Sequence, residues 1–319
     1  MTSSAEKVSE FINRLSELQQ SDPALFLQGV ALFQDVRHLS MRHVRAKALH
    51  VALIRLGELI EATGFANHIV VRGDGIYVDV DGVLLDTLSN RLYLKNTGAR
   101  QANIGKAMAE VLAKFGVSLD TVVDIGANFG EATLWFAKSY PRARVIAVEA
   151  SSANRAVFEK NRRAQSFPTQ HVELWPVALL DYTGRTWITA GVGTMNRVSS
   201  KPDQGTEEVD CDSLENQFRK HGVTSADFVK IDIEGAEPLL ERALVSLGKR
   251  VRAYLIEFSK FSPLEDYSAL ATALIKTGFL CYDEQGSRPL KGGVEVENHL
   301  KQVLGNDDTI VTNLWFIAA

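Results

Sequence analysis

Four acidic side chains lie at the ends of short apolar runs in the second part of the chain: Asp124, Glu149, Asp232 and Glu257. Each run is typical of a buried strand, and each is followed by a stretch with helical periodicity. In an open parallel sheet the carboxyl ends of the strands line one crevice, so acids far apart in the sequence can converge there. A single acid at a strand end is common at a solvated edge, but four in succession predict a site for chemistry.

The first of these strands leads into a turn with two glycines, in the segment Thr121–Gly130, which reads TVVDIGANFG. A dinucleotide fingerprint has three glycines, spaced G-x-G-x-x-G, with a pyrophosphate on the helix N-terminus. Here Gly126 and Gly130 are present, and Asn128 stands where the middle glycine would be. Asp124 would repel a pyrophosphate and suits a cationic amine. S-adenosylmethionine carries such an amine, with a sulfonium and no phosphate, so the turn favours this methyl donor over NAD.

Glu149 ends the next apolar run and lies 23 residues after Gly126. This separation is expected for one strand–helix–strand unit whose second strand ends beside the first. An acid at this place can accept hydrogen bonds from both ribose hydroxyls of a nucleoside. Rossmann-like nucleoside sites share the feature, so Glu149 predicts a nucleoside ligand without choosing among them.

The segment Lys230–Glu234 reads KIDIE, and residues 230, 232 and 234 would share one face of an extended strand. At the mouth of a cofactor crevice, Asp232 could take the proton of an attacking hydroxyl while Lys230 stabilises the developing oxyanion. Asp232 with Glu257, or with Glu234, could instead hold a divalent cation. The sequence has no denser carboxylate cluster, which favours a site without metal, and no metal ligand is predicted.

The composition is that of an ordinary globular protein, with a net charge of −4 and a pI near 6.0. Such a balance does not attract nucleic acid or an anionic membrane. The chain also lacks an Asn/Asp-Pro-Pro-Tyr motif, a signal peptide and an apolar run of membrane-spanning length. Cys211 and Cys281 lack metal-ligand spacing and are expected to be small core residues. We therefore expect a cytoplasmic protein whose partner is a small-molecule or saccharide acceptor.

Three segments differ in their periodicity. Residues 1–66 are expected to be helical, and the broad apolar face of the third helix indicates packing within its own domain; a homodimer contact is the alternative. Residues 67–98 hold two Asp-Gly pairs between β-prone runs, which predict a small antiparallel hairpin or meander. Residues 99–319 begin with a helix and then alternate strands and helices. This alternation predicts an α/β domain with a mostly parallel sheet covered on both faces.

Several blocks together resemble the FkbM family of S-adenosylmethionine-dependent O-methyltransferases, in their order and spacing over about residues 120–260: Asp124–Glu131, Val148–Ala150, Val177–Leu179, Val209–Leu214 and Asp227–Glu237. The block KIDIEGAE within the last of these is the most specific. The resemblance implies a Rossmann-like class I methyltransferase fold with seven strands, the last of them antiparallel at about residues 312–318.

The resemblance also implies which residues bind the donor. The methionine end would lie in the turn formed by Asp124, Gly126, Ala127, Asn128, Phe129 and Gly130. Glu149 would bind ribose beside Ala150 and Ser151, and Ala178 would lie near adenine. Lys230, Asp232 and Glu257 would be the catalytic residues, and the acceptor would be a hydroxyl of a sugar or a polyketide-like natural product.

Two features depart from the family pattern. Ser259 stands where a histidine is expected in many relatives, and residues 1–100 match nothing in the family. The loop Gly191–Arg197 is either a substrate flap or a plain turn. A methyltransferase-like binding or scaffold protein without turnover is the alternative function, although the intact candidate residues argue against it. A dehydrogenase is a more distant alternative.

Overall fold

The computed structural model describes residues 17, 21, 70–73, 76–79, 107–165, 167–189, 197–199, 206–305 and 311–319. The chain divides into two compact units, Met1–Ala102 with Val157–Phe167, and Asn103–Ala156 with Pro168–Ala319. The predicted helices of residues 1–66 and the dimer contact lie outside the described residues, apart from helical positions 17 and 21.

The first unit contains a strand pair. β1 (Val70–Gly73) and β2 (Ile76–Asp79) run antiparallel, with Gly73 opposite Ile76. The two residues between them in the sequence are the first predicted Asp-Gly pair, so the expected hairpin pairing is present at this place. The second Asp-Gly pair lies outside the described residues.

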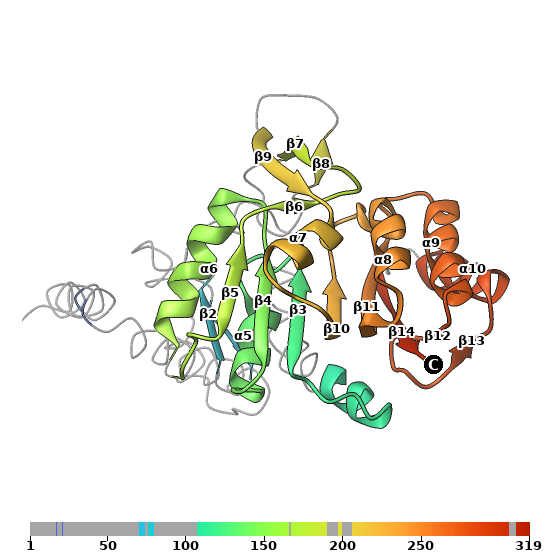
Figure 1. The fold of residues 1–319 in the computed structure, drawn as a ribbon, viewed down its shortest axis with the longest axis horizontal. Coiled ribbons are helices and arrows are strands. Elements are labelled where there is room, and N and C mark those ends of the chain that lie inside the picture. The colour runs from blue at the N-terminus through green and yellow to red at the C-terminus, as the bar shows by residue number, and fades with distance from the viewer. Residues whose placement is uncertain are drawn as a thin grey trace, which may run out of the picture. The chain divides into compact units, whose positions relative to one another are not determined.

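The second unit is built on a twisted, mostly parallel sheet of eight strands in the order β13-β12-β14-β11-β10-β3-β4-β5 (Figure 1). The strands span β3 (Thr121–Ile125), β4 (Arg144–Val148), β5 (Val172–Trp175), β10 (Ala226–Ile231), β11 (Val251–Ser259), β12 (Phe279–Tyr282), β13 (Pro289–Leu290) and β14 (Val311–Ala318). β14 is antiparallel to β11 and β12, as predicted for the last strand. The seven expected strands are therefore present, and the two-residue β13 adds an eighth at the edge.

Helices cover both faces of this sheet, as predicted. After a helix over 107–114 they span α5 (Glu131–Ser139), α7 (Leu214–Lys220), η3 (Glu237–Leu240), α8 (Glu241–Leu247), η4 (Gly248–Arg250), α9 (Leu264–Lys276) and α10 (Gly293–Leu304). α6 (Ser152–Ala164) begins in the second unit and continues into the first. On one face, buried side chains such as Val229 of β10 belong to the same apolar core as Leu244 of α8 and Leu274 of α9. On the other face, Phe228 of β10 packs against Phe136 of α5. Neighbouring residues of one strand thus serve opposite layers.

A second sheet follows β5 and was not predicted as a sheet. It has four strands in the order β6-β9-β7-β8, spanning β6 (Ala178–Leu179), β7 (Gly184–Thr189), β8 (Val198–Ser199) and β9 (Thr206–Asp212). Figure 1 shows it beyond the carboxyl ends of β3, β4 and β10. β5 ends at Trp175, and β6 pairs with β9 after Pro176, which has no N–H for the ladder.

Both cysteines are buried and free, as predicted for core residues. Among the described residues, no helix combines the length and the apolar character needed to cross a membrane.

Candidate functional site at the carboxyl ends of β3, β4, β10 and β11

The glycine turn after β3 contains three residues in the left-handed region, Gly126 (φ 80°), Asn128 (φ 51°) and Gly130 (φ 93°). Asparagine tolerates this region better than most residues, which explains how it can replace a glycine here. The amides of Gly126 and Ala127 both donate to the carbonyl of Val148 at 3.0 Å, which ties the turn to β4.

The glycine turn also touches the chain that leaves β10. A Cβ atom on Gly126 would lie 1.8 Å from the carbonyl oxygen of Asp232. The amide of Asp232 donates to the carbonyl of Ile125 at 3.0 Å. The predicted donor side and the predicted catalytic block are therefore in direct backbone contact, and Gly126 has to be glycine for this approach as well as for its φ angle.

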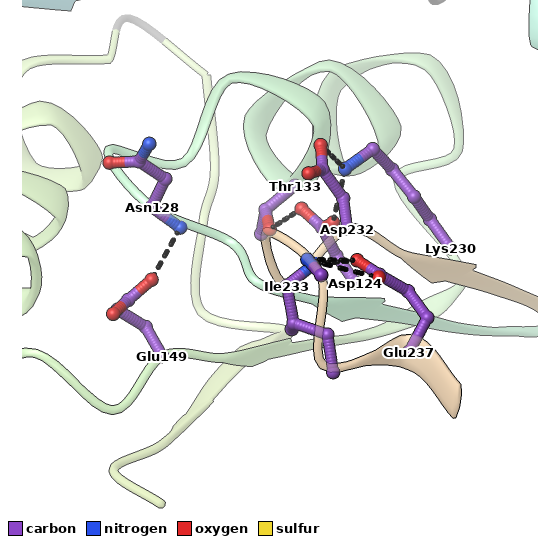
Figure 2. A network of polar contacts seen from close by, with 9 residues as sticks. Asp124, Asn128, Thr133, Glu149, Lys230, Asp232, Ile233 and Glu237 are labelled. Carbon is purple, nitrogen blue, oxygen red and sulfur yellow. Dashed lines mark hydrogen bonds and ion pairs between the residues drawn. The ribbon is translucent and has the colours of Figure 1, made fainter. Parts of the chain in front are cut away.

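Glu149 follows β4 directly, and its side chain is turned back toward the glycine turn (Figure 2). One carboxylate oxygen accepts from the amide of Asn128 and the other from the amide of Ser151, both at 2.8 Å. Burial raises the pKa of Glu149, and the two amides oppose the shift. Each carboxylate oxygen has lone pairs left for another donor, such as a hydroxyl.

Asp124 is almost fully buried near the end of β3, and only one of its two carboxylate oxygens has a hydrogen bond within the described part of the chain. Its Oδ2 accepts from the hydroxyl of Thr133 on α5 at 2.6 Å. Its Oδ1 is buried without a hydrogen-bond partner among the described residues, as is Oδ1 of Asn128. Buried acceptors without partners are costly, so a bound donor would relieve the cost.

Lys230 connects the two sides of the site. Its Nζ lies 2.8 Å from Asp232 Oδ2 and 3.7 Å from Asp124 Oδ1. Burial disfavours the ammonium form, but the negative charges of Asp232 and Asp124 outweigh it and hold the pKa of Lys230 above its usual range. Lys230 is therefore a fixed cation and not a proton acceptor.

Asp232, Glu234 and Glu257 form an acid cluster, with one carboxylate oxygen of each within 4.8 Å of the others. Burial raises the pKa of Glu234 to about 8, with Asp232 and Glu237 adding to the shift and Arg197 opposing it. Burial and the charges of Asp232 and Glu234 also raise the pKa of Glu257. Carboxylates this close cannot all ionise easily, so the acid cluster holds protons near neutral pH.

Two expectations about this cluster are wrong in detail. Residues 230, 232 and 234 do not share a strand face, because β10 ends at Ile231 and Glu234 has a left-handed backbone (φ 54°). Glu257 is not the end of its strand, because β11 continues to Ser259 by pairing with β14. The three carboxylates meet nevertheless, through a turn that brings Glu234 back toward Asp232.

The remaining predicted donor residues lie as follows. Ala127 and Phe129 are buried in the glycine turn, Ser151 is buried beside Glu149, and Ala150 is partly buried. Ala178 is buried in β6 of the second sheet, where it pairs with Cys211 of β9.

Sequence reasoning missed two acidic residues and an aromatic contact. Glu131 begins α5, and burial raises its pKa to about 7, opposed by Lys230 and reinforced by Asp124 and Asp232. Glu237 is buried at the start of η3. The guanidinium of Arg197 lies 3.5 Å from the ring centre of Phe261. Glu131 and Glu237 both lie inside the recognised motifs, so their positions could have been predicted from the sequence. The contact of Arg197 with Phe261 joins distant segments, and no sequence pattern indicates it.

The strand order, with β14 inserted antiparallel between β11 and β12, and a site at the carboxyl ends of the strands define a class. The second unit has the Rossmann-like fold of the class I methyltransferases. Residues 124–281 match the family model of the methyltransferase FkbM domain. This stretch is therefore a domain of the FkbM methyltransferase family, and the protein is a methyltransferase.

Solved structures of methyltransferases are similar to this one. Magnesium protoporphyrin IX methyltransferase from Synechocystis PCC 6803, with bound SAM, is 11% identical at a TM-score of 0.43, covering 74% of this chain and 88% of that one. Precorrin-6y C5,15-methyltransferase from Geobacter metallireducens GS-15 is 12% identical at a TM-score of 0.37, covering 66% and 87%. No curated protein matches the sequence.

Proposed function

We propose that the protein transfers a methyl group from S-adenosylmethionine to a hydroxyl of a sugar or a polyketide-like natural product. The observation that carries the proposal is the position of Lys230, whose Nζ lies within 4 Å of both Asp124 and Asp232. A donor-binding acid and a catalytic acid are thereby held at one point of the sheet edge.

The donor side has the groups that S-adenosylmethionine needs. Oδ1 of Asp124 and Oδ1 of Asn128, which have no hydrogen-bond partner among the described residues, are acceptors for the amine of its methionine part. The carboxylate of Glu149, oriented by two backbone amides, is an acceptor for its ribose hydroxyls. The amides of Gly126, Ala127 and Asn128 already donate to Val148 and Glu149, and Asp124 would repel a pyrophosphate.

The acceptor side has the groups that deprotonate an alcohol. When bound, S-adenosylmethionine supplies a methyl group on a sulfonium, so a C–O bond forms as the C–S bond breaks and a neutral thioether leaves. Asp232, supported by Glu257 in the acid cluster, takes the hydroxyl proton. Lys230, held as a cation, stabilises the charge that develops on the attacking oxygen. The carboxylates also accept hydrogen bonds from neighbouring hydroxyls, which suits an acceptor with several of them.

A first experiment measures donor binding and transfer in the full chain. Isothermal titration should show binding of S-adenosylmethionine and none of NAD. Release of S-adenosylhomocysteine should then be measured over a panel of glycosides and macrolide-type alcohols. Absence of donor binding would overturn the proposal, and donor binding without transfer to any hydroxyl would favour the scaffold alternative.

A second experiment tests the role of Asp232. Asp232→Asn should keep donor affinity within about threefold and lower the transfer rate at least about 100-fold, the usual range for a general base. Asp210→Asn is the matched control, because Asp210 is an exposed carboxylate on β9 that pairs with Arg185. Full activity of Asp232→Asn would exclude Asp232 as the base.

A further inference from the structure

The loop that presents the acid cluster has an unfavourable backbone. After β10 ends at Ile231, Glu234 (φ 54°) and Gly235 (φ 99°) are both left-handed. The left-handed conformation destabilises a residue that has a Cβ atom by about 1–2 kcal/mol. Asp232 and Glu234 therefore keep their places only if other contacts hold the loop.

The carboxylate of Glu237 makes those contacts. It accepts from the amide of Ile233 at 2.8 Å and from the amide of Gly235 at 3.1 Å (Figure 2). The Glu237 side chain is only 1% exposed, so these charge-assisted hydrogen bonds are not weakened by water. The two amides flank Glu234 on both sides and fix the turn at this residue.

A buried chain of hydroxyl groups links Glu237 to the end of β11. The hydroxyl of Tyr267, on α9, donates to Glu237 at 3.0 Å and lies 3.1 Å from Ser259 Oγ. Ser259 Oγ in turn accepts from the amide of Phe261 at 3.3 Å. With Tyr267 donating to the carboxylate, Ser259 donates to Tyr267, and every group in the chain has a partner. Ser259 thus has a defined contact at the position where the family pattern suggested a histidine.

The segment that follows Ser259 contacts the same loop a second time. Ser262 Oγ donates to the carbonyl of Gly235. A Cβ on Gly235 would come within 2.9 Å of Phe261 Cβ, so the two segments are packed closely. The strand that carries Glu257 and the loop that carries Asp232 and Glu234 are therefore joined through η3 and α9.

We propose that Glu237 is a positioning residue for methyl transfer. It sets the loop geometry that brings Asp232 and Glu234 to the acceptor, and through Tyr267 and Ser259 it holds this loop against the strand that carries Glu257. The proposal rests on the role proposed above for Asp232. The donor side should be independent of Glu237, because the backbone of Asp232 is held separately by the carbonyl of Ile125.

The test compares Glu237→Gln, Tyr267→Phe and the control Glu241→Gln in the full chain. Within the described part of the chain, Glu241 makes no hydrogen bond to this loop. Hydrogen exchange followed by mass spectrometry should show faster exchange of the amides over residues 232–237 in Glu237→Gln. Exchange over residues 121–131 should be unchanged, and so should the affinity for S-adenosylmethionine, within about threefold.

The kinetic arm uses whichever glycoside or alcohol of the panel is methylated. Glu237→Gln should lower kcat about 10- to 100-fold while the KM for S-adenosylmethionine changes less than about threefold, since misplacement of catalytic groups by about 1 Å has costs of this size. Tyr267→Phe keeps both amide contacts of Glu237 and should lower kcat less. If Glu237→Gln does not fold, the kcat of Tyr267→Phe tests the positioning role in its place.

The outcomes are distinct for the two proposals. Unchanged exchange over residues 232–237, or an unchanged kcat, in folded Glu237→Gln would overturn the positioning role. A loss of donor affinity equal to the loss of kcat would also overturn it, because it would indicate general loosening. Failure of the proposed function would show instead in the unsubstituted protein, as absence of donor binding or transfer.

Discussion

Single positions of the glycine turn have different steric requirements, and these requirements determine which side chain each position accepts. Gly126, Asn128 and Gly130 are all left-handed, yet their roles differ. Asn128 gives its amide to Glu149 and keeps a free buried side-chain oxygen, so a side chain is useful there. Gly126 lies against the carbonyl of Asp232, where no side chain has room. A substitution at Gly126 should therefore affect both halves of the site.

Gly126→Ala is expected to destabilise the protein by about 3 kcal/mol or more, from left-handed strain plus a clash with backbone. It should also abolish measurable binding of S-adenosylmethionine, because the turn and Asp232 must move apart. Denaturant unfolding and isothermal titration measure the two effects. Gly222→Ala is the control: Gly222 is left-handed too (φ 66°), but its added Cβ meets nothing within 4 Å. It should cost about 1 kcal/mol and leave donor binding intact; equal effects of both substitutions would contradict the contact argument.

At the scale of elements, the site depends on links between a strand end and the helix or loop beside it. α5 is linked to β3 by the hydrogen bond from Thr133 to Asp124. The residue after β10, Asp232, is linked to the end of β3 by the hydrogen bond from its amide to the carbonyl of Ile125. These links fix the orientation of Asp124 and the height of Asp232 at the sheet edge, which the strands alone would leave open.

Thr133→Val tests the link between α5 and β3. Valine has nearly the same shape, but it leaves Oδ2 of buried Asp124 without its donor. The free energy of unfolding should fall by about 1–3 kcal/mol, the usual cost of an unsatisfied buried group. The affinity for S-adenosylmethionine should fall at least several-fold, because Asp124 loses its orientation. Thr277→Val is the control, since the Thr277 hydroxyl donates to carbonyls of its own helix, at Ala273 and Leu274. Unaltered donor affinity in Thr133→Val would argue against a role for Asp124 in binding.

Sequence reasoning was reliable where one local motif determines the geometry. The glycine turn follows from Asp124 to Gly130, and the parallel strands follow from their apolar runs. It was unreliable where distant segments decide. β11 runs on to Ser259 because Ser259 pairs with Val311, and β6 leaves the main sheet to pair with β9. Glu237 lies inside a recognised motif, but its hydrogen bond from Tyr267, thirty residues further along the chain, depends on the tertiary fold.

At the scale of the whole molecule, the net charge of −4 conceals an uneven distribution of acids. Burial raises the pKa of carboxyl groups that gather around the candidate site: Glu131, Glu149, Glu234, Glu237 and Glu257. Elsewhere, carboxylates with good partners have a lowered pKa, such as Glu173 with Arg144 and Asp212 with Thr183 and Asn216. Buried acids without full compensation cost stability, and concentrating them at one edge of the sheet is typical of a functional site.

This distribution predicts that the protein becomes less stable as the pH rises from 6.5 to about 9. Glu131 and Glu234 have a pKa of about 7 and about 8 in the folded state, against 4.5 for an unperturbed glutamate, so the folded state binds more protons than the unfolded state in this range. Their stabilising protonation is complete below pH 4.5 and is lost as the pH passes through the folded-state values. His221 and His299, whose pKa is lowered by burial, act mainly below their ordinary value of 6.5 and hardly oppose the trend.

The free energy of unfolding from urea titrations should fall by on the order of 2 kcal/mol over the range, since each pKa unit corresponds to about 1.4 kcal/mol. Glu234→Gln should flatten the dependence, whereas Glu208→Gln, at an exposed carboxylate on β9, should leave it unchanged. A stability that rises with pH over this range would show that these carboxyl groups are ionised in the folded protein.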